Sequence, residues 1–239
     1  MTWETARVAE IVPETPRTRT LLLDLDGWPG HRPGQHLDVR LTAEDGYRAE
    51  RSYSIASAPE DGHVSITVEL LDDGEVSPYL VQEVEVGDRF EIRGPIGGYF
   101  VWEAKDGGPL LLVAGGSGIV PLRSMLRHRA AVGSDVPTRL VYSSRTLAEV
   151  IYRSELDELA GRRDGLELVQ TLTRDAPPDW AGRTGRVDET LLREVSWPPD
   201  TGQTAFVCGP TGFVETVAAA LVSLGHDPLR VNTERFGGS

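Results

Sequence analysis

Cysteine, lysine and long apolar runs are nearly absent from this chain of 239 residues. Its only cysteine, Cys208, excludes a disulfide within the chain and any metal cluster held by several of its cysteines. The longest clearly apolar run, Leu110 to Ala114, is far shorter than the roughly 20 residues that span a bilayer. The first residues also lack the basic-then-apolar order of a secretory signal. We therefore expect a cytoplasmic protein that does not associate with membranes.

Positive charge is scarce as well. The 24 basic residues are outnumbered by 37 acidic ones, and the formal net charge of −13 argues against a nucleic-acid partner. Lys105 is the only lysine, so nearly every basic side chain is an arginine. The planar guanidinium group of arginine can bind a phosphate through two parallel hydrogen bonds, although a compositional bias explains the excess equally well. An arginine is therefore a candidate ligand only where its neighbours in the sequence support that role.

Short segments of alternating polarity, separated by turn residues, fill the chain up to about residue 100. Examples are Arg19–Leu25, His36–Leu41 and Val64–Leu70. Several short strands at close spacing predict an antiparallel barrel or sandwich. Between them a brief helix is expected from Ser77 to about Glu83, with Ser77 as its cap.

A different pattern begins after the polar, glycine- and proline-containing stretch Trp102–Pro109. Continuous apolar strands now alternate with amphipathic helices, which predicts a parallel sheet covered on both faces. The expected strands are Leu110–Val113, Thr138–Tyr142, Leu166–Leu172, Ala205–Cys208 and Leu229–Thr233, and the expected helices are Pro121–Ala131, Leu147–Leu159 and Thr211–Leu224.

Two segments of the first half have the composition of a ligand site. In the segment Arg51-Ser52-Tyr53-Ser54, a strand would direct Arg51 and Tyr53 to one face, so that a cation lies beside an aromatic ring. That pair could hold an aromatic dinucleotide, or it could belong to an ordinary barrel strand. The turn Gly74-Glu-Val-Ser-Pro78 opens the short helix, and its backbone N–H groups favour an anion such as pyrophosphate, although many surface turns look alike.

Two glycine-rich turns of the second half follow apolar strands and open helices. They are Gly115-Gly-Ser-Gly-Ile-Val-Pro121 and Cys208-Gly-Pro-Thr-Gly212, and the first lacks the Gly-x-Gly-x-x-Gly spacing of a Rossmann turn. Both would lie at the carboxyl edge of one parallel sheet, where α/β proteins bind ligands. Cys208 has no evident base partner, so it is either a small buried residue or part of a pocket rather than a nucleophile.

Taken in order, the short motifs of this chain resemble those of the ferredoxin–NADP reductase superfamily, especially the reductases of bacterial oxygenases. The resemblance spans nearly the whole sequence. The motifs are Arg51-Ser-Tyr-Ser, Gly74-x-Val-Ser, Gly94-Pro-Ile-Gly-Gly-Tyr-Phe, Gly115-Gly-Ser-Gly-Ile-Val-Pro, Cys208-Gly-Pro and Glu234-Arg-Phe-Gly.

The resemblance implies an antiparallel β-barrel FAD-binding domain over residues 1–104 and an α/β parallel-sheet NAD(P)-binding domain over residues 105–239. On the barrel, Arg51 would bind the FAD pyrophosphate, Tyr53 would pack on the isoalloxazine ring, and Ser54 would hydrogen-bond near its N5 atom. The FAD-binding residues implied in this way are Arg51, Ser52, Tyr53, Ser54, Gly74, Val76 and Ser77.

On the α/β domain, the first glycine-rich turn would bind the NAD(P)H pyrophosphate, and Cys208 would lie near the nicotinamide carbon that gives up hydride. Glu234 and Phe236 would close over the reactive side of the flavin. The nucleotide-binding residues implied are Gly115, Gly116, Gly118, Pro121, Cys208, Gly209 and Pro210, and the candidate catalytic residues are Ser54, Cys208, Glu234 and Phe236.

Three arginines bear on the choice of coenzyme. Arg145, Arg174 and Arg186 each follow or flank an expected strand end, and in NADPH-using relatives arginines at similar places hold the ribose 2′-phosphate. An acidic residue on the 2′-hydroxyl would instead indicate NADH, and none lies at the Ser143-Ser-Arg145 tip. We expect NADPH, with NADH as the alternative.

The implied activity is the transfer of a hydride from NAD(P)H to FAD, followed by single-electron transfer to a separate ferredoxin, haem protein or other metalloprotein. One alternative is a reductase or diaphorase for a diffusible flavin or quinone, and another is a non-catalytic flavin- or nucleotide-binding regulatory subunit. The five histidines show no metal-binding spacing, so no metal site is expected, and we expect a monomer. Oxygenase reductases often continue into a ferredoxin domain and plant-type members end on a tyrosine, and neither feature follows Glu234-Arg-Phe-Gly here.

Overall fold

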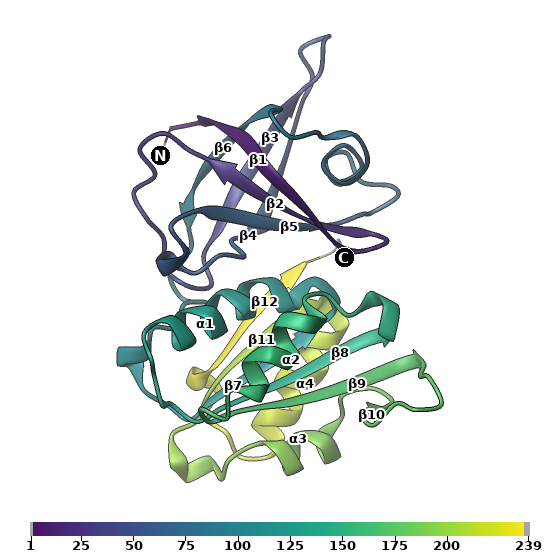
Figure 1. Ribbon diagram of the computed structural model, residues 1–239. Helices are drawn as coiled ribbons and strands as arrows, with labels where there is room; N and C mark the ends of the chain where they lie inside the picture. Colours follow the sequence, from purple (N-terminus) through teal and green to yellow (C-terminus); the bar gives the residue numbers. More distant parts are fainter. Residues whose placement is uncertain (1, 237–239) are drawn as a thin grey trace.

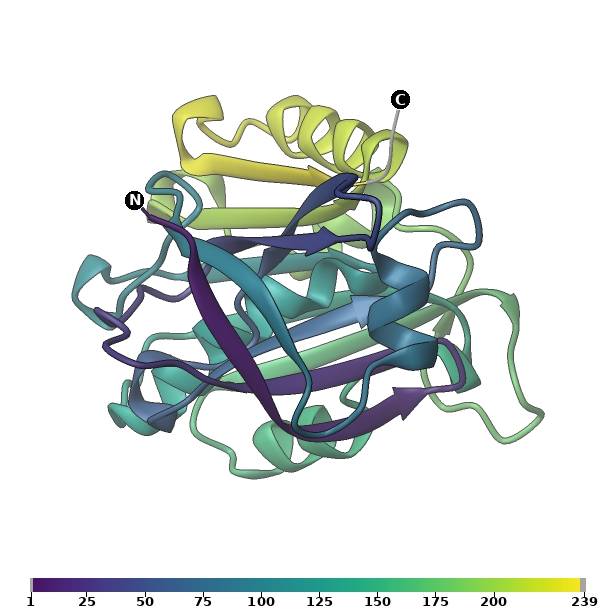
Figure 2. The same ribbon diagram turned by 90° about the horizontal axis from the view of Figure 1, so that it is seen from above.

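The computed structural model describes residues 2–236 and stacks an antiparallel β domain on a parallel α/β domain (Figure 1). Seen from above, the strands of the first domain lie over the sheet and helices of the second (Figure 2). None of the helices within residues 2–236 is long and apolar enough to cross a lipid bilayer. The predicted fold class, a β-barrel followed by a parallel-sheet α/β domain, is confirmed.

Six strands form the first sheet in the order β4-β3-β6-β1-β2-β5, and all neighbours are antiparallel. A bridge between Ile55 and Ile66 links the end of β4 to β5, so the sheet curls into a barrel. Alternate side chains such as Leu21, Leu37 and Val39 fill its interior. The strands are β1 (Glu4–Thr15), β2 (Thr18–Asp24), β3 (His36–Thr42), β4 (Arg48–Ser54), β5 (Val64–Glu69) and β6 (Arg89–Ile96).

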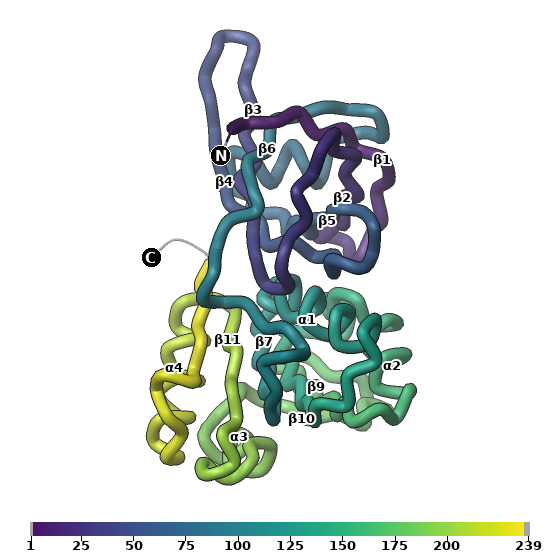
Figure 3. Tube along the Cα trace, turned by 90° about the vertical axis from the view of Figure 1, so that its left-hand side faces the viewer, coloured from purple at the N-terminus to yellow at the C-terminus, as the bar shows by residue number. Residues whose placement is uncertain are grey.

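The second sheet is parallel throughout, in the order β10-β9-β8-β7-β11-β12. Because neighbouring residues of a strand point to opposite faces, Leu110 and Leu112 pack under α1 and α2, whereas Leu111 and Val113 pack under α3 and α4. Figure 3 shows the two helix pairs on opposite sides of the sheet. The elements are β7 (Leu110–Gly115), α1 (Ile119–Ala131), β8 (Thr138–Thr146), α2 (Arg153–Gly161), β9 (Leu166–Asp175), β10 (Arg183–Thr184), α3 (Glu189–Val195), β11 (Thr204–Pro210), α4 (Thr211–Ser223) and β12 (Val231–Phe236).

Two sequence predictions of local structure are wrong. The helix expected over Leu147–Leu159 is broken, because Tyr152 lies in the left-handed region at φ 59° and α2 begins only after it. The short helix before β6 is a π-helical turn, Tyr79–Glu83, which the side chain of Ser77 does not cap. The Ser77 hydroxyl instead accepts a hydrogen bond from the Leu71 amide at 3.1 Å, which fixes the preceding turn.

Helix α1 joins the two domains. The Ser124 hydroxyl donates to the Ser57 carbonyl at 2.6 Å, and Arg127 pairs with Asp61 of the barrel at 2.7 Å and with Glu155 of α2 at 2.6 Å. The Ser124 bond is buried and the Arg127 pairs are partly buried, so these contacts help to set the orientation of the barrel on the sheet. The expected boundary between residues 104 and 105 falls in the connection from β6 to β7 and stays a prediction.

Candidate functional site

The carboxyl ends of the central strands meet beneath the barrel. Figure 1 shows β12 running up to the first domain, and β12 continues the sheet beside β11, which lies beside β7. The β11–β12 register pairs Cys208 with Glu234 and Pro210 with Phe236. This edge of the sheet therefore brings the second glycine-rich turn and the last described residues to the barrel surface. Open α/β sheets bind their ligands at this carboxyl edge.

The first glycine-rich turn lies against the end of β11 and has no room for a side chain at Gly115 or Gly118. A Cβ atom on Gly118 would be 2.0 Å from the Cys208 carbonyl oxygen, and one on Gly115 would meet the Phe213 ring at 2.9 Å. Gly116 has φ 56°, a conformation that favours glycine. The two expected turns thus form one contiguous backbone surface at the start of α1, whose first amides lack partners within the helix.

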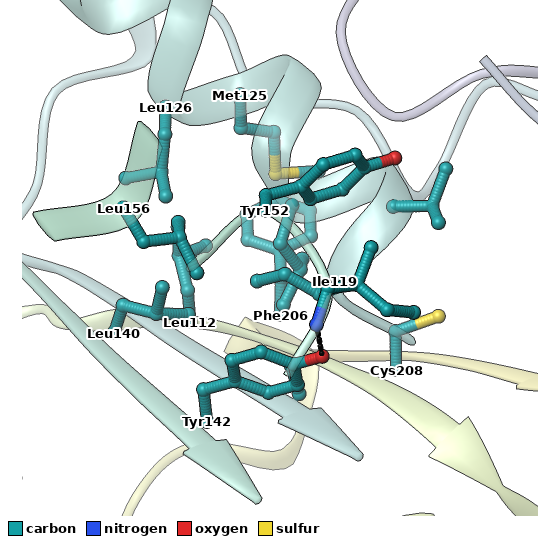
Figure 4. Packing of buried hydrophobic residues seen from close by; sticks show 14 of the residues in the cluster. Leu112, Ile119, Met125, Leu126, Leu140, Tyr142, Tyr152, Leu156, Phe206 and Cys208 are labelled. Atoms are coloured by element: carbon teal, nitrogen blue, oxygen red, sulfur yellow. Dashed lines mark hydrogen bonds between the residues drawn. The ribbon is translucent and has the colours of Figure 1, made fainter. Parts of the chain in front are cut away.

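Cys208 lies at the margin of the buried cluster between the sheet and α1, next to Ile119 (Figure 4). Its side chain is fully buried. Burial, with a smaller contribution from the carboxylate of Glu234, raises the pKa of the Cys208 thiol well above its ordinary value. The thiol is therefore protonated at neutral pH, which agrees with a pocket residue and not with a nucleophile.

Glu234 is a nearly buried carboxyl group at the junction of the domains. Its side chain is 21% exposed, and its Oε2 atom has no hydrogen-bond partner among residues 2–236. Burial raises the pKa of Glu234 to about 7, so the group exchanges its proton near neutral pH. Phe236 packs against the same buried cluster as Cys208.

His36 is the functional neighbour that the sequence did not reveal. Its Nδ1 atom is 3.9 Å from Glu234 Oε1, and the β3–β4 register sets it opposite Ser54. Burial lowers the pKa of His36, so at neutral pH this contact is not a firm ion pair. The pairing of β3 with β4 brings His36 beside Ser54, the docking of the two domains brings it near Glu234, and no local motif marks the histidine.

Tyr99 was part of a quoted motif but carried no expected role. Its hydroxyl donates to the Thr233 carbonyl of β12 at 2.5 Å, although the residue is 66% exposed. The adjacent Phe100 packs edge-to-face on Phe206 of β11, with ring centroids 5.2 Å apart. These contacts tie the end of the barrel to the last strands of the sheet.

The expected FAD residues of β4 point in two directions. Tyr53 is partly buried against the barrel core, and Arg51 is half-exposed at the surface and forms an ion pair with Glu75. The Ser52 hydroxyl lies on the other face and donates to Asp38 at 2.7 Å. Of these side chains, Arg51 alone combines positive charge with exposure, which a phosphate ligand requires.

Of its residues expected to bind FAD, the turn before the π-helical segment can offer the ligand only backbone groups and one hydroxyl. The Val76 side chain is fully buried, and Ser77 is 5% exposed. A Cβ atom on Gly74 would be 2.8 Å from the Ser77 hydroxyl oxygen, so the turn is tight at this position. The expected roles of Gly74, Val76 and Ser77 stay predictions.

Comparison with known proteins agrees with this arrangement. The family model described as "Oxidoreductase FAD-binding domain" matches residues 6–101, and the one described as "Oxidoreductase NAD-binding domain" matches residues 112–219. The chain belongs to the ferredoxin–NADP reductase superfamily.

Curated relatives include the glycine betaine monooxygenase reductase subunit of Chromohalobacter salexigens, which is 32% identical over 211 residues. That match covers 87% of this chain and 56% of the relative, so the chain spans little more than half the length of that protein. The flavohemoprotein of Bordetella pertussis is 30% identical, over 98% of this chain and 61% of its own length.

A similar solved structure is the FAD/NAD-binding domain of nitric oxide dioxygenase from Vibrio cholerae, with a TM-score of 0.86 and 26% identity. The match covers 98% of this chain and 99% of that one. A ferredoxin NADP+ reductase from Neisseria gonorrhoeae with bound FAD and NADP gives a TM-score of 0.85 at 20% identity, over 98% of this chain and 99% of that one, and shares the fold.

The cofactors of this reductase family are FAD and a nicotinamide dinucleotide, and the residues present fit both. At Gly116 the space where a Cβ atom would lie is open, which leaves the backbone of the turn accessible to a phosphate, and Arg51 supplies an exposed cation on the barrel. The unpartnered Oε2 atom of Glu234 lies between the two domains.

Of the three arginines of the coenzyme prediction, Arg145 and Arg174 lie near the ends of β8 and β9, and Arg186 follows β10. The register pairs Ser144 of β8 with Leu172 of β9, and Leu172 with Thr184 of β10, so Arg145, Arg174 and Arg186 come at the same edge of the sheet. All three are exposed, and Arg145 is 4.0 Å from Glu149. They occupy the half of the edge away from β11 and β12.

Proposed function

We propose that this protein is an FAD-dependent reductase that takes a hydride from NAD(P)H and passes electrons singly to a separate protein. The observation that carries the proposal is the approach of His36, the strand partner of Ser54, to Glu234, the strand partner of Cys208, between an FAD-binding and an NAD-binding domain. When bound, FAD supplies the chemistry of accepting a hydride pair and releasing electrons one at a time. The chain itself binds, aligns and shields the reactants.

Each named residue has a task in that alignment. The glycine turn of Gly115 and Gly118 would hold the coenzyme's pyrophosphate and so fix the nicotinamide beside Cys208. The Ser54 hydroxyl would orient the flavin on the barrel side, and Phe236 would exclude water from the sheet side. Glu234, whose pKa of about 7 lets it hold or release a proton near neutral pH, would exchange a proton at its carboxyl oxygens.

We infer NADPH as the preferred coenzyme and NADH as the alternative. The support is the set of exposed guanidinium groups on the ends of β8, β9 and beyond β10. Among residues 2–236, neither Arg174 nor Arg186 pairs with a carboxylate, so both are available to a 2′-phosphate.

The acceptor is inferred from relatives. Their names include the reductase subunit of glycine betaine monooxygenase and the ferredoxin–NAD(P)+ reductase component of naphthalene 1,2-dioxygenase systems from a Ralstonia species. Both names couple a reductase to an oxygenase, which supports a ferredoxin, a haem protein or another metalloprotein as the acceptor. A cytoplasmic, monomeric protein is part of the same proposal.

Anaerobic stopped-flow reduction of the FAD-loaded protein tests the function. NADPH and NADH should each be mixed with the protein while flavin absorbance is followed, and rapid saturable bleaching with either coenzyme is the expected result. Bound flavin that neither coenzyme reduces would instead indicate a regulatory subunit. Efficient steady-state turnover with free flavin or quinone at low concentration, with no gain from added ferredoxin or haem protein, would favour the diffusible-acceptor alternative.

A further inference from the structure

The cation that we assign to the FAD pyrophosphate already has an anionic partner. Arg51 Nη2 donates to Glu75 Oε2, and Arg51 Nη1 donates to the Glu50 carbonyl at 2.7 Å. Glu75 lies between Gly74 and Val76, inside the turn that is expected to support the same pyrophosphate. A carboxylate therefore lies at the point where two anionic phosphates would approach.

A second contact holds Glu75 in this position. The Tyr47 hydroxyl, from the turn between β3 and β4, donates to Glu75 Oε1 at 2.5 Å. Each carboxylate oxygen thus has one partner, and the hydrogen bonds from Tyr47 and Arg51 lower the pKa of Glu75 below its ordinary value. Glu75 is therefore ionised at neutral pH and is held by two side chains of the β3–β4 hairpin.

We propose that Glu75 competes with the FAD pyrophosphate for the guanidinium group of Arg51 and so sets how tightly the protein retains its flavin. A carboxylate and a phosphate both use the paired N–H groups of the guanidinium fork, and two anions beside each other repel. Binding FAD through Arg51 then requires Glu75 to give up its ion pair, while Tyr47 can keep the displaced carboxylate hydrogen-bonded. This inference rests on the proposed role of Arg51.

The competition is modest because the ion pair is exposed to water. The Arg51 and Glu75 side chains are 51% and 44% exposed, and pairs of this kind are worth little in solution. Replacing the carboxylate by an amide of the same shape, Glu75→Gln, should tighten FAD binding by about two- to five-fold. If Glu75 instead served to orient Arg51 toward the flavin, the same substitution would weaken binding.

A matched variant distinguishes the effect of losing the Arg51–Glu75 ion pair from the effect of losing one negative charge near the site. Asp73 lies in the same exposed turn and makes no hydrogen bond or ion pair within residues 2–236. The FAD dissociation constant of the full chain should be measured for the wild type, Glu75→Gln and Asp73→Asn by titration with FAD at neutral pH. Tightening in Glu75→Gln that exceeds that in Asp73→Asn is the expected result, and equal or weaker binding in Glu75→Gln overturns the proposal.

Variants of Arg51 distinguish failure of this inference from failure of the assignment beneath it. Arg51→Ala should weaken FAD binding, and in that background Glu75→Gln should act no more strongly than Asp73→Asn, because the shared guanidinium group is gone. If Arg51→Ala leaves the dissociation constant unchanged, Arg51 is not the pyrophosphate ligand. If Arg51→Ala weakens binding but Glu75→Gln does not tighten it, only the competition by Glu75 is refuted.

Discussion

Glu234 is an ionisable residue at the junction of the two domains, where its carboxyl group is shielded from water. Burial raises its pKa from 4.5 to about 7, so the folded protein binds this proton more tightly than the unfolded chain does. Between those two values the folded state holds more protons, and the stability contributed by this group falls as the pH rises. Above the folded pKa, the protein bears the cost of a mostly buried carboxylate whose Oε2 atom has no partner among residues 2–236.

The substitution Glu234→Gln should remove this cost. Below pH 4 the variant and the wild type should differ little, and above pH 8 the variant should be more stable by up to about 3 kcal/mol, since each pKa unit corresponds to about 1.4 kcal/mol. Urea unfolding between pH 4 and pH 9 measures the difference. Glu215→Gln, on an exposed position of α4, is the control and should show no such trend. A gain in Glu234→Gln that is the same at every pH would show that ionisation is not its cause.

Gly118 shows how closely the two glycine-rich turns are packed. The atoms that a Cβ would meet are all backbone, the Cys208 carbonyl and the Gly209 nitrogen, and backbone cannot rotate away as a side chain can. Gly118→Ala should therefore shift the turn, destabilise the protein by about 1–3 kcal/mol and raise the coenzyme KM. Gly161→Ala, where a Cβ has no atom within 4 Å, should change stability by about 0.5 kcal/mol at most. Thermal unfolding and steady-state kinetics report both effects, and a KM in Gly118→Ala equal to that of the wild type would argue against a coenzyme site at this turn.

At the scale of elements, sequence periodicity predicted those strands and helices whose apolar residues alone mark them as buried. The apolar run at Leu110 could only be a buried strand, and its alternate residues face different helix pairs. The break before α2 was not predictable, because Tyr152 is held by distant groups. Its hydroxyl bonds to Thr67 of the barrel, and the neighbouring Ile151 amide donates to the Tyr142 hydroxyl at 3.1 Å. Tertiary contacts of this kind override helix propensity.

The residues of the site were likewise predictable where a local motif marks them and not where tertiary contacts place them. Motifs named the residues at strand ends, such as Cys208, because a glycine-rich turn after a strand has a local signal. His36 has none, since its position beside Glu234 follows from pairing between β3 and β4 and from the docking of the two domains. Helix α3 was also missed, although Asp188 accepts from the Leu191 amide at 2.8 Å and so provides a cap that the sequence displays.

Substitution of the arginines at the ends of β8 and β9 tests the coenzyme proposal. A 2′-phosphate near Arg145 or Arg174 would accept charge-assisted hydrogen bonds, each worth about 1.5–3 kcal/mol. Arg145→Ala and Arg174→Ala should each lower kcat/KM for NADPH by roughly ten-fold or more and leave the value for NADH nearly unchanged. Arg193→Ala, an exposed arginine of α3 paired with Glu189, serves as the control. A wild type that prefers NADH, or equal losses with both coenzymes, would contradict the NADPH preference and leave the reductase assignment intact.

At the scale of the whole molecule, the proposed activity depends on the angle between two domains. The contacts of α1 with Ser57 and Asp61 lie on one side of the site, and the bond from Tyr99 to Thr233 lies on the other. The first set is mostly buried and charged, whereas the second includes a single hydrogen bond from an exposed side chain. The contacts on the α1 side are therefore the stronger of the two sets, and they control how the sheet edge faces the barrel.

Arg127 links the two domains on the α1 side, because it forms ion pairs with Asp61 in one domain and Glu155 in the other. Arg127→Ala should leave the partly buried Asp61 carboxylate without its cation, whereas Glu155 keeps its ion pair with Arg123, and should destabilise the protein by about 1–3 kcal/mol. Because the domains would also lose their fixed orientation, flavin reduction at saturating coenzyme should slow by roughly ten-fold. Arg139→Ala is the matched control, since Arg139 pairs with Glu167 and stacks on Trp197 within the α/β domain alone. The control should lose stability but keep the wild-type reduction rate in stopped-flow experiments. If Arg127→Ala also keeps that rate, α1 holds the domains together without aligning the reactants.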